Sequence, residues 1–257
     1  MTLPVYRADE VGCCDLGDLL ELVGSEGAHA ARVKRHRVGE RVDLVDGRGT
    51  RATCEVVAAG PSDLQLRVLS RRVDAVTTPR LVLVQALAKG GRDLQAVESA
   101  CELGVDRIIP WQAERSIARW PQKKSNKSHA KWVDQASAAS KQSRRARWPV
   151  VDDLVGTPDL CEAVREAGSA GALVILAHEE SSAPLRVLLE DTVEEVWVIV
   201  GPEGGIAPAE VEALTGSGAR PARLGPHIMR TSSAGPAALA AIAAMTGHWD
   251  EEGQATL

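Results

Sequence analysis

Phenylalanine is absent from this sequence, and one tyrosine and six tryptophans leave aromatic residues at only 3% of the chain. Alanine, arginine and valine are abundant instead, which we interpret as genomic composition bias rather than as a sign of function. Hydrophobic residues still amount to 44% and charged residues to 25%, as in an ordinary soluble globular protein. The 257 residues suffice for one large domain or two smaller ones with a stable core.

Long apolar runs are also missing. The longest weakly polar stretch, residues 234–245, is too short and too rich in alanine to span a bilayer. Arg7, Asp9 and Glu10 near the N-terminus are followed by no apolar segment, so this end does not resemble a signal peptide. We therefore expect a cytoplasmic protein with no membrane partner.

The sequence lacks the common motifs of metal, nucleotide and acyl chemistry. Its five cysteines are odd in number and no two have CxxC spacing, which argues against a disulfide framework and a zinc site. GxGxxG, GxxxxGKS/T, HExxH and GxSxG are all absent. A Rossmann dinucleotide site, a P-loop, metal catalysis and acyl transfer therefore have no support, and we expect no metal.

The net charge of −5 is unevenly distributed along the chain. Residues 1–78 hold 11 basic and 12 acidic side chains (net −1), residues 79–150 hold 14 and 6 (net +8), and residues 151–257 hold 5 and 17 (net −12), which sum to −5. A basic middle in an acidic protein is typical of a face that binds a polyanion such as RNA. Solvated helix faces would give the same count.

Residues 1–73 are expected to form a small β-rich domain. Alternating polar and apolar residues predict strands, and Asp46-Gly47 is a strong signal for a hairpin turn. The expected elements are one helix with Ser25 as N-cap and three strands, at residues 25–35, 41–45, 50–58 and 64–69. Short strands joined by tight turns favour a small barrel.

Strands and helices alternate after a linker at residues 74–80. Continuous apolar runs predict buried strands at 81–87, 107–111, 172–177 and 196–200, and helices are expected at 93–103, 131–143, 159–167, 208–214 and 232–246. Pro236 would lie in the first turn of the last helix. Residues 81–257 are thus expected to form an α/β domain with a mainly parallel sheet. A mobile basic loop is predicted at residues 116–129, with Arg119, Lys123, Lys124 and Lys127.

Three loops are distinctive, at residues 176–180, 200–205 and 224–234; the first two follow predicted strands, and the last two contain glycine and proline. Open α/β sheets bind ligands at the carboxyl ends of their strands. Glycines there let a ligand approach the backbone, and Ile228 and Met229 offer apolar walls. These features predict a cofactor or nucleotide cleft, although three ordinary turns could look similar.

Several groups of residues together resemble a known family. They are residues 88–92 (AKGGR), 102–110 (ELGVDRIIP), 114–116 (ERS), Lys131-Trp132, 138–145 (AASKQSRR), 201–205 (GPEGG) with Pro208, Glu210 and Val211, and 224–234 (LGPHIMRTSSA), with 29–33 (HAARV) and 46–49 (DGRG) near the N-terminus. This set resembles the RsmE family, SPOUT enzymes that methylate N3 of a uridine in 16S rRNA. The resemblance covers nearly the whole chain.

The resemblance implies an α/β SPOUT domain with a C-terminal trefoil knot over residues 81–257, preceded by a PUA-like β-barrel that binds RNA. It also implies a homodimer that uses S-adenosyl-L-methionine and acts on 16S rRNA in the assembled 30S subunit. The donor would be bound by Leu176, Ala177, His178, Gly201, Pro202, Gly205, Leu224, Gly225, Ile228, Met229, Thr231 and Ala234. At His178 either the backbone or the side chain could make the contact.

Methylation of uracil N3 requires that its proton leave or that the developing anion be stabilised. Arg230 is the first candidate to stabilise that anion. Glu203 is a candidate base, although it could instead cap Gly204 and Gly205 or contact the amine of the donor. Phosphate contacts are expected from Arg32, Arg35, Lys89, Arg92, Arg115, Lys141, Arg144 and Arg145.

Two alternatives stay open at this point. Another SPOUT methyltransferase, acting on a ribose 2′-OH or a tRNA base, would share the donor site. A non-catalytic RNA-binding or assembly factor could keep the fold without binding the donor.

Overall fold

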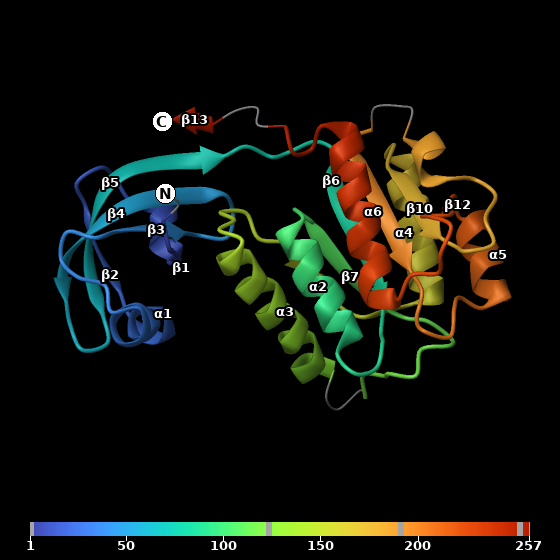
Figure 1. The fold of residues 1–257 in the computed structure, drawn as a ribbon, viewed down its shortest axis with the longest axis horizontal. Helices are drawn as coiled ribbons and strands as arrows, with labels where there is room; N and C mark the ends of the chain where they lie inside the picture. Colours follow the sequence, from blue (N-terminus) through green and yellow to red (C-terminus); the bar gives the residue numbers. More distant parts are fainter. Residues whose placement is uncertain (1–2, 122–124, 190–192, 251–253, 257) are drawn as a thin grey trace. The chain divides into compact units, whose positions relative to one another are not determined.

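The computed structural model describes residues 3–121, 125–189, 193–250 and 254–256, and the chain divides into two compact units (Figure 1). The first unit contains Met1–Ala75, Ser140–Trp148 and Glu251–Leu257, and the second contains Val76–Ala139 and Pro149–Asp250. The predicted second domain includes residues 140–148, whereas the structure groups them with the first unit. Composition could not reveal this, because the segment is far from the rest of that unit in sequence.

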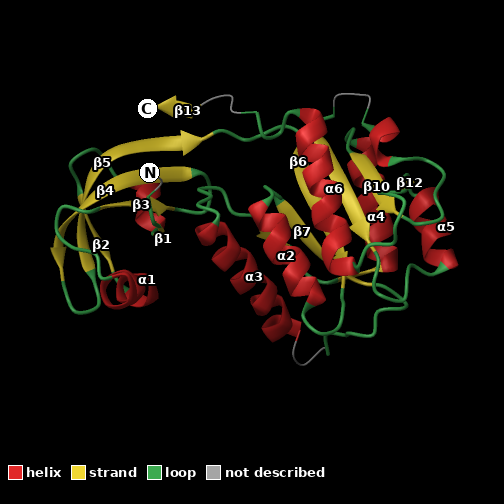
Figure 2. Cartoon of the chain, viewed as in Figure 1, coloured by secondary structure: helices red, strands yellow, loops and turns green. Residues whose placement is uncertain are grey.

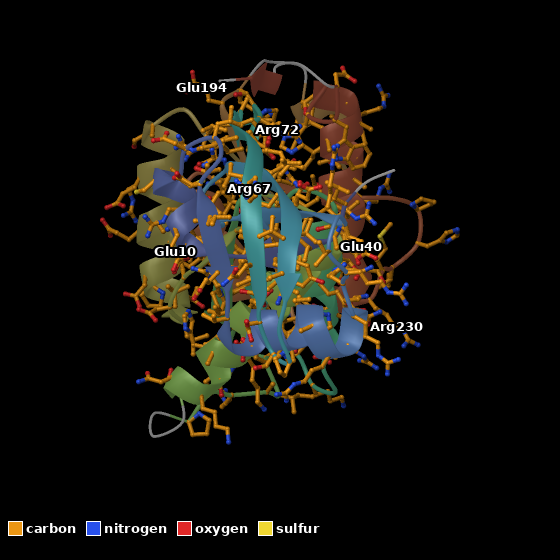
Figure 3. The ribbon with its side chains drawn as sticks, turned by 90° about the vertical axis from the view of Figure 1, so that its left-hand side faces the viewer. Glu10, Glu40, Arg67, Arg72, Glu194 and Arg230 are labelled. Carbon is orange, nitrogen blue, oxygen red and sulfur yellow. The ribbon has the colours of Figure 1, made fainter. Side chains whose placement is uncertain are left out.

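A six-stranded sheet forms the first unit, in the order β1-β3-β4-β5-β13, with β2 also paired to β5. The strands are β1(Val5–Arg7), β2(Leu19–Leu22), β3(Arg41–Val45), β4(Thr50–Ala59), β5(Leu64–Asp74) and β13(Gln254–Thr256). The three strands predicted in this region are therefore confirmed. Along β5, Leu64 and Leu66 are buried and Arg67 is exposed; Arg67 and Arg72 are labelled on this strand in Figure 3. This alternation puts one face of the strand in the core.

The helical part of the first unit is short and irregular. α1(Gly24–Ala28) continues as the π-helical η2(His29–Lys34), and Arg35 ends it with a left-handed φ of 56°. The predicted helix is present, but the N-cap prediction for Ser25 is wrong. Val23 occupies the cap position without a side-chain hydrogen bond. A further 3-10 helix, η1(Asp9–Cys13), was not predicted.

Residues 140–148, which we call the strap, are bonded to the hairpin between β3 and β4. Gly47 turns this hairpin with a φ of 77°, as the Asp46-Gly47 pair predicts. Three hydrogen bonds fix the strap: Arg51 to the carbonyl of Arg144 (2.7 Å), the Gly49 N–H to the carbonyl of Ala146 (3.1 Å) and the Trp148 N–H to the carbonyl of Gly47 (2.9 Å). The strap is therefore an integral part of the first unit.

Every strand pair in the described part of the second unit's sheet is parallel, which confirms the predicted α/β class. The strand order is β12-β10-β11-β6-β7-β8, with β9 also paired to β7. The strands are β6(Arg80–Ala86), β7(Arg107–Gln112), β8(Val150–Val151), β9(Val155–Gly156), β10(Leu173–Ala177), β11(Glu195–Val200) and β12(Arg220–Ala222). Helices cover both faces of this sheet (Figure 2), so its central strands are almost wholly apolar.

Two cores lie on the two faces of this sheet. The helices are α2(Arg92–Glu102), α3(Ser125–Gln142), α4(Thr157–Ser169), α5(Pro208–Gly216) and α6(Thr231–Thr246), with the short η4(Leu185–Leu188). Leu83 of β6 packs in the core that contains α2, α3 and α6 residues, and Val84 packs in the core that contains α4 and α5 residues. Successive strand residues point to opposite faces, so β6 supplies both cores alternately. No helix among the described residues is long and apolar enough to cross a membrane.

Two boundary predictions in this unit are wrong. The predicted mobile loop at residues 116–129 is helical in its last part, because α3 begins at Ser125 and includes Lys127. Lys123 and Lys124 lie outside the described residues. The last helix begins at Thr231, so Pro236 lies in its second turn rather than its first. The Thr231 hydroxyl donates to the carbonyl of Gly201 (2.7 Å), which fixes the start of α6 at that residue.

Candidate active site

The carboxyl ends of β10, β11 and β12 carry three loops that surround one cleft of about 410 Å³. Both β11 and β12 pair with β10, so loops that are distant in sequence meet at the same edge of the sheet. The lining residues are Arg92, Ala177, His178, Glu179, Val200, Gly201, Pro202, Glu203, Gly205, Ile206, Arg223, Leu224, Gly225, Pro226, His227, Ile228, Met229, Arg230, Thr231 and Ala234. A cavity of this size accommodates a cofactor-sized ligand.

Eleven of the twelve residues predicted to hold the donor line this cleft, as do Glu203 and Arg230. The exception is Leu176, whose fully buried side chain packs in the core with α4 and α5 residues. The cleft is reached instead by the next two residues of the chain, Ala177 and His178. The predicted residues are thus neighbours in space, although their sequence separation is large.

The loop after β11 folds tightly upon itself. A Cβ at Gly201 would lie 2.5 Å from Cγ1 of Ile206, so no larger residue fits there without a shift of the loop. Gly205 has a left-handed φ of 72°, and its N–H donates to the carbonyl of Pro202 (3.0 Å) to close the turn. The loop therefore requires glycine at positions 201 and 205 of the GPEGG sequence. In this fold the backbone of Gly201 lines the cleft.

The loop after β12 supplies an apolar wall. Ile228 is 85% exposed and Met229 is 39% exposed, which is unusual for side chains of their size and hydrophobicity. Both line the cleft beside Leu224 and Gly225. Exposed apolar side chains next to a cavity are suited to cover the apolar surface of a ligand.

Glu203 connects the cleft to a second loop. Its Oε1 accepts a hydrogen bond from the Lys89 N–H (3.1 Å) and one from Nη1 of Arg92 (3.3 Å). Its Oε2 is buried and has no hydrogen-bond partner among the described residues. These hydrogen bonds come from Lys89 and Arg92 and not from Gly204 or Gly205. One carboxylate oxygen thus accepts hydrogen bonds from residues at and just before the start of α2, and the other has no partner among the described residues.

Arg230 lies at the N-cap position of α6 and its side chain is exposed at the cleft. Its backbone carbonyl accepts hydrogen bonds from Ser233 (2.8 Å) and Ala234 (2.9 Å). Its guanidinium makes no hydrogen bond or ion pair with the part of the chain that the structure describes. The backbone is therefore fixed while the charged end stays available to a ligand.

Asp93 is a buried carboxyl near the cleft that is not among the residues predicted from the sequence. It accepts hydrogen bonds from the N–H groups of Leu94 (2.8 Å) and Ala88 (3.3 Å), and so holds the loop that carries Lys89 and Arg92. Burial raises the pKa of Asp93, and the backbone hydrogen bonds offset only part of that rise. The available signal was an acidic residue in the first turn of a helix directly after two glycines.

The predicted RNA-binding residues fall into two groups, one in each unit. Lys89, Arg92 and Arg115 belong to the second unit, where Nη1 of Arg115 donates to the carbonyl of Gly204 (3.3 Å). Arg32, Arg35, Lys141, Arg144 and Arg145 belong to the first. Lys141 forms an ion pair with Glu26, which reduces its availability to phosphate. Arg144 is exposed and has a left-handed φ of 59°.

The described residues include no group of three or more His, Cys, Asp or Glu side chains that could hold a metal ion. The polar side chains that line the cleft are carboxylates, guanidinium groups, two imidazoles and the Thr231 hydroxyl. This donor set is suited to bind a charged organic ligand.

Comparisons with known proteins match both units. The RNA methyltransferase domain family matches residues 76–243, and the RNA methyltransferase PUA domain family matches residues 23–69. The chain is 42% identical over 236 residues to ribosomal RNA small subunit methyltransferase E of Mycobacterium bovis, covering 92% of this chain and 90% of that protein. It is 28% identical to the protein of the same name from Bacillus subtilis, covering 88% and 90%.

Solved structures agree with this similarity. A Legionella pneumophila protein in complex with S-adenosylmethionine superposes with a TM-score of 0.83 at 28% identity, covering 95% of this chain and 98% of that one. A small subunit methyltransferase E from Neisseria gonorrhoeae, also bound to S-adenosylmethionine, gives a TM-score of 0.83 at 25% identity, with the same coverage. The parallel α/β unit, the PUA domain and the extent of these matches lead to one conclusion: the chain belongs to the RsmE family of RNA methyltransferases.

Proposed function

We propose that this chain uses S-adenosyl-L-methionine to methylate N3 of a uridine in the 16S rRNA of the small ribosomal subunit. The observation that carries the proposal is the cleft at the carboxyl ends of β10, β11 and β12, with the exposed Arg230 beside it. The relatives that match nearly the whole chain are named as small subunit methyltransferases, and two similar structures contain the methyl donor.

The cleft fits a ligand that joins an adenosine to a cationic sulfur and an amino acid. Apart from the adjacent residues of the chain, no described atom lies closer than 3.8 Å to the position that a Cβ would take at Gly205 or Gly225, so a ligand can approach the backbone there. Met229 offers an apolar surface for a ring, and Glu179 adds negative charge at the cleft. When bound, S-adenosylmethionine supplies an electrophilic methyl group.

Arg230 is the residue that we assign to the acceptor base. Uracil N3 becomes nucleophilic when its proton leaves, and the negative charge then spreads onto the two carbonyl oxygens of the ring. A guanidinium is always charged and has donors in a planar fork that fits such oxygens. Fixed donors aimed at developing negative charge typically contribute about 10²–10³-fold in rate.

Glu203 is the candidate that would receive the proton, through Oε2. Oε2 has no hydrogen-bond partner among the described residues, whereas Oε1 already accepts hydrogen bonds from the Lys89 N–H and from Arg92. A carboxylate braced in this way keeps its position while the second oxygen accepts a proton. The competing role is purely structural, because the same bonds join two loops.

The basic residues of both units would bind the phosphates of the RNA. The strap contains Lys141, Arg144, Arg145 and Arg147 and no acidic residue. In the second unit, Lys89 and Arg115 are exposed next to the loop after β11. Phosphate contacts of this kind position the RNA without reading its sequence, so recognition of one uridine would come from the folded subunit.

A homodimer, a trefoil knot in the C-terminal loops and a cytoplasmic location are further parts of this proposal. The support for a dimer lies on α6, where Ala237, Ala240, Ala241 and Ala244 are all at least partly exposed. Small side chains allow a helix of a second copy to approach closely. Sedimentation of the purified chain would show whether it is a dimer.

The decisive experiment is methyl transfer to 30S subunits that lack the modification, with naked 16S rRNA as the parallel substrate. Mass spectrometry of the nucleosides should find N3-methyluridine in the subunit sample. A 2′-O-methylated nucleoside, or a product only with tRNA, would favour another SPOUT activity instead. Failure to bind S-adenosylmethionine by calorimetry would favour a non-catalytic assembly factor.

A further inference from the structure

Gln85 is a polar side chain in an otherwise apolar strand. It stands near the end of β6, between Val84 and Ala86, and is 0% exposed. A buried primary amide is unfavourable unless its polar atoms find hydrogen-bond partners. Its hydrogen bonds therefore identify the groups that it holds in place.

The amide of Gln85 begins a chain of hydrogen bonds that ends at the cleft. Nε2 of Gln85 donates to Oγ1 of Thr231 (2.8 Å) and to the carbonyl of Ala86 (3.1 Å). Oγ1 of Thr231 donates in turn to the carbonyl of Gly201 (2.7 Å). A hydroxyl has only one hydrogen, and an N–H group already occupies one of the lone pairs of Oγ1. The hydrogen of Thr231 is therefore directed at Gly201.

This chain joins three segments that are distant in sequence. Gly201 begins the loop after β11, Thr231 is the first residue of α6, and both line the cleft, whereas Gln85 does not. Gln85 and Thr231 are both buried, so little water competes for these bonds. The orientation of two cleft residues is thus set by a side chain outside the cleft.

Stability alone does not explain an amide at this position. Oε1 of Gln85 is buried and has no partner among the described residues. An apolar side chain of similar size would avoid the loss of hydration of this oxygen. A role in positioning and a role in stability consequently predict different results for the same substitution.

We propose that Gln85 is a positioning residue for the methyl-donor cleft, because through the Thr231 hydroxyl it fixes the Gly201 carbonyl in the orientation that receives the donor. The inference rests on the proposed function, since that function makes S-adenosylmethionine the ligand of the cleft. Gln85 itself touches neither donor nor RNA in this arrangement.

Calorimetric titration of the full chain with S-adenosylmethionine tests the proposal. Gln85→Met should weaken donor binding about tenfold, the loss expected for a misdirected buried hydrogen bond. Its Tm should stay equal to that of the unsubstituted chain or rise, because Met removes the unpartnered oxygen. A Tm that falls while the dissociation constant is unchanged would overturn the proposal in favour of a merely structural role.

A double-mutant cycle tests whether Gln85 acts through Thr231. Thr231→Val should weaken binding about as much as Gln85→Met, and the double variant should bind no more weakly than Thr231→Val alone. Thr231→Ser keeps the hydroxyl and should bind almost normally. Additive losses in the double variant would overturn the proposed route. If Gln85→Met does not fold, Thr231→Val alone tests the proposal, and normal donor binding by this variant would overturn it.

Val84→Ala is the matched control, because Val84 is the adjacent residue of β6 and packs in the core on the opposite face. It should lower the Tm without changing the dissociation constant. If the unsubstituted chain binds no donor, the proposed function fails and this inference fails with it. If that chain binds and Gln85→Met binds equally well, the inference alone fails.

Discussion

The carboxylate of Glu203, in the loop after β11, and the guanidinium of Arg92, the first residue of α2, form an ion pair of 3.3 Å across a sequence separation of 111 residues. The pair is partly buried, with 16% of the Glu203 side chain and 35% of the Arg92 side chain exposed. The pair supports a structural role for Glu203 in joining these segments, beside its role as candidate base. The two roles can be separated by experiment.

Glu203→Gln should distinguish the structural role from the role as base. If Glu203 only joins the loops, the variant should bind S-adenosylmethionine several-fold more weakly and methylate normally at saturating donor. If Oε2 accepts the N3 proton, kcat should fall by about 10²–10⁴-fold and its pH dependence should change. Glu212→Gln, on the exposed face of α5, is the control and should alter neither quantity. Unchanged binding and unchanged kcat would contradict both roles.

Arg230→Ala should lower kcat by about 10²–10³-fold while donor binding stays normal, because the guanidinium is assigned to the acceptor base. Single-turnover methylation of 30S subunits and calorimetry measure the two effects separately. Arg223→Ala is a matched control, since Arg223 is exposed and lines the same cleft. Full methylation by Arg230→Ala would rule out the anion-stabilising role.

Gly201→Ala should destabilise the chain by about 1–3 kcal/mol, because the added Cβ would lie 2.5 Å from Cγ1 of Ile206. Thermal unfolding should then shift down by about 2–10 °C. Gly168→Ala in α4, where a Cβ meets no atom within 4 Å, should leave the Tm unchanged or raise it slightly. Equal Tm values for the two variants would show that the loop after β11 is less tightly folded than the structure indicates.

Asp93 should make stability fall as the pH rises above the ordinary value of 3.8 for its carboxyl group. Burial raises its pKa, so the folded chain binds this proton more tightly than the unfolded chain does. The free energy of unfolding therefore decreases through the interval between the unfolded and folded pKa values. Asp93→Asn should flatten that decrease when urea unfolding is measured over a series of pH values above 3.8. Parallel pH profiles for the two chains would contradict the assignment.

Arg51→Met should destabilise the first unit by about 3–5 kcal/mol, because it removes the ion-pair partner, at 2.8 Å, of the buried Asp43 carboxylate. The substitution also removes the hydrogen bond from Arg51 to the carbonyl of Arg144 in the strap. Urea unfolding monitored by tryptophan fluorescence reports the loss. Arg72→Met removes a partly exposed pair with Asp74 and should cost less than about 1 kcal/mol. Similar losses in the two variants would argue against a special role for the buried pair.

Most helices and strands could be predicted from the sequence, because the spacing of hydrophobic residues and the identity of turn residues depend on only a few neighbouring positions. The strand at residues 41–45 and the turn at Gly47 are examples. The cleft could be predicted because glycine-rich loops at strand ends are visible in sequence. The role of Gln85 could not be predicted, because it depends on a hydrogen bond to Thr231, which is 146 residues away in sequence. Lys141 and Arg144 were predicted to bind RNA, but their place in the first unit depends on contacts with Glu26 and Arg51.

The strap also constrains the order in which the chain can acquire its structure during synthesis. Five strands of the first unit's sheet, within residues 5–74, are translated long before the strap, yet Arg51, Gly49 and Gly47 form hydrogen bonds with residues 144–148. Until those residues leave the ribosome, the Arg51 side chain has no carbonyl from Arg144 to bind. The first unit is therefore expected to reach its final stability late in synthesis, when first the strap and then β13, which pairs with β5, have been translated.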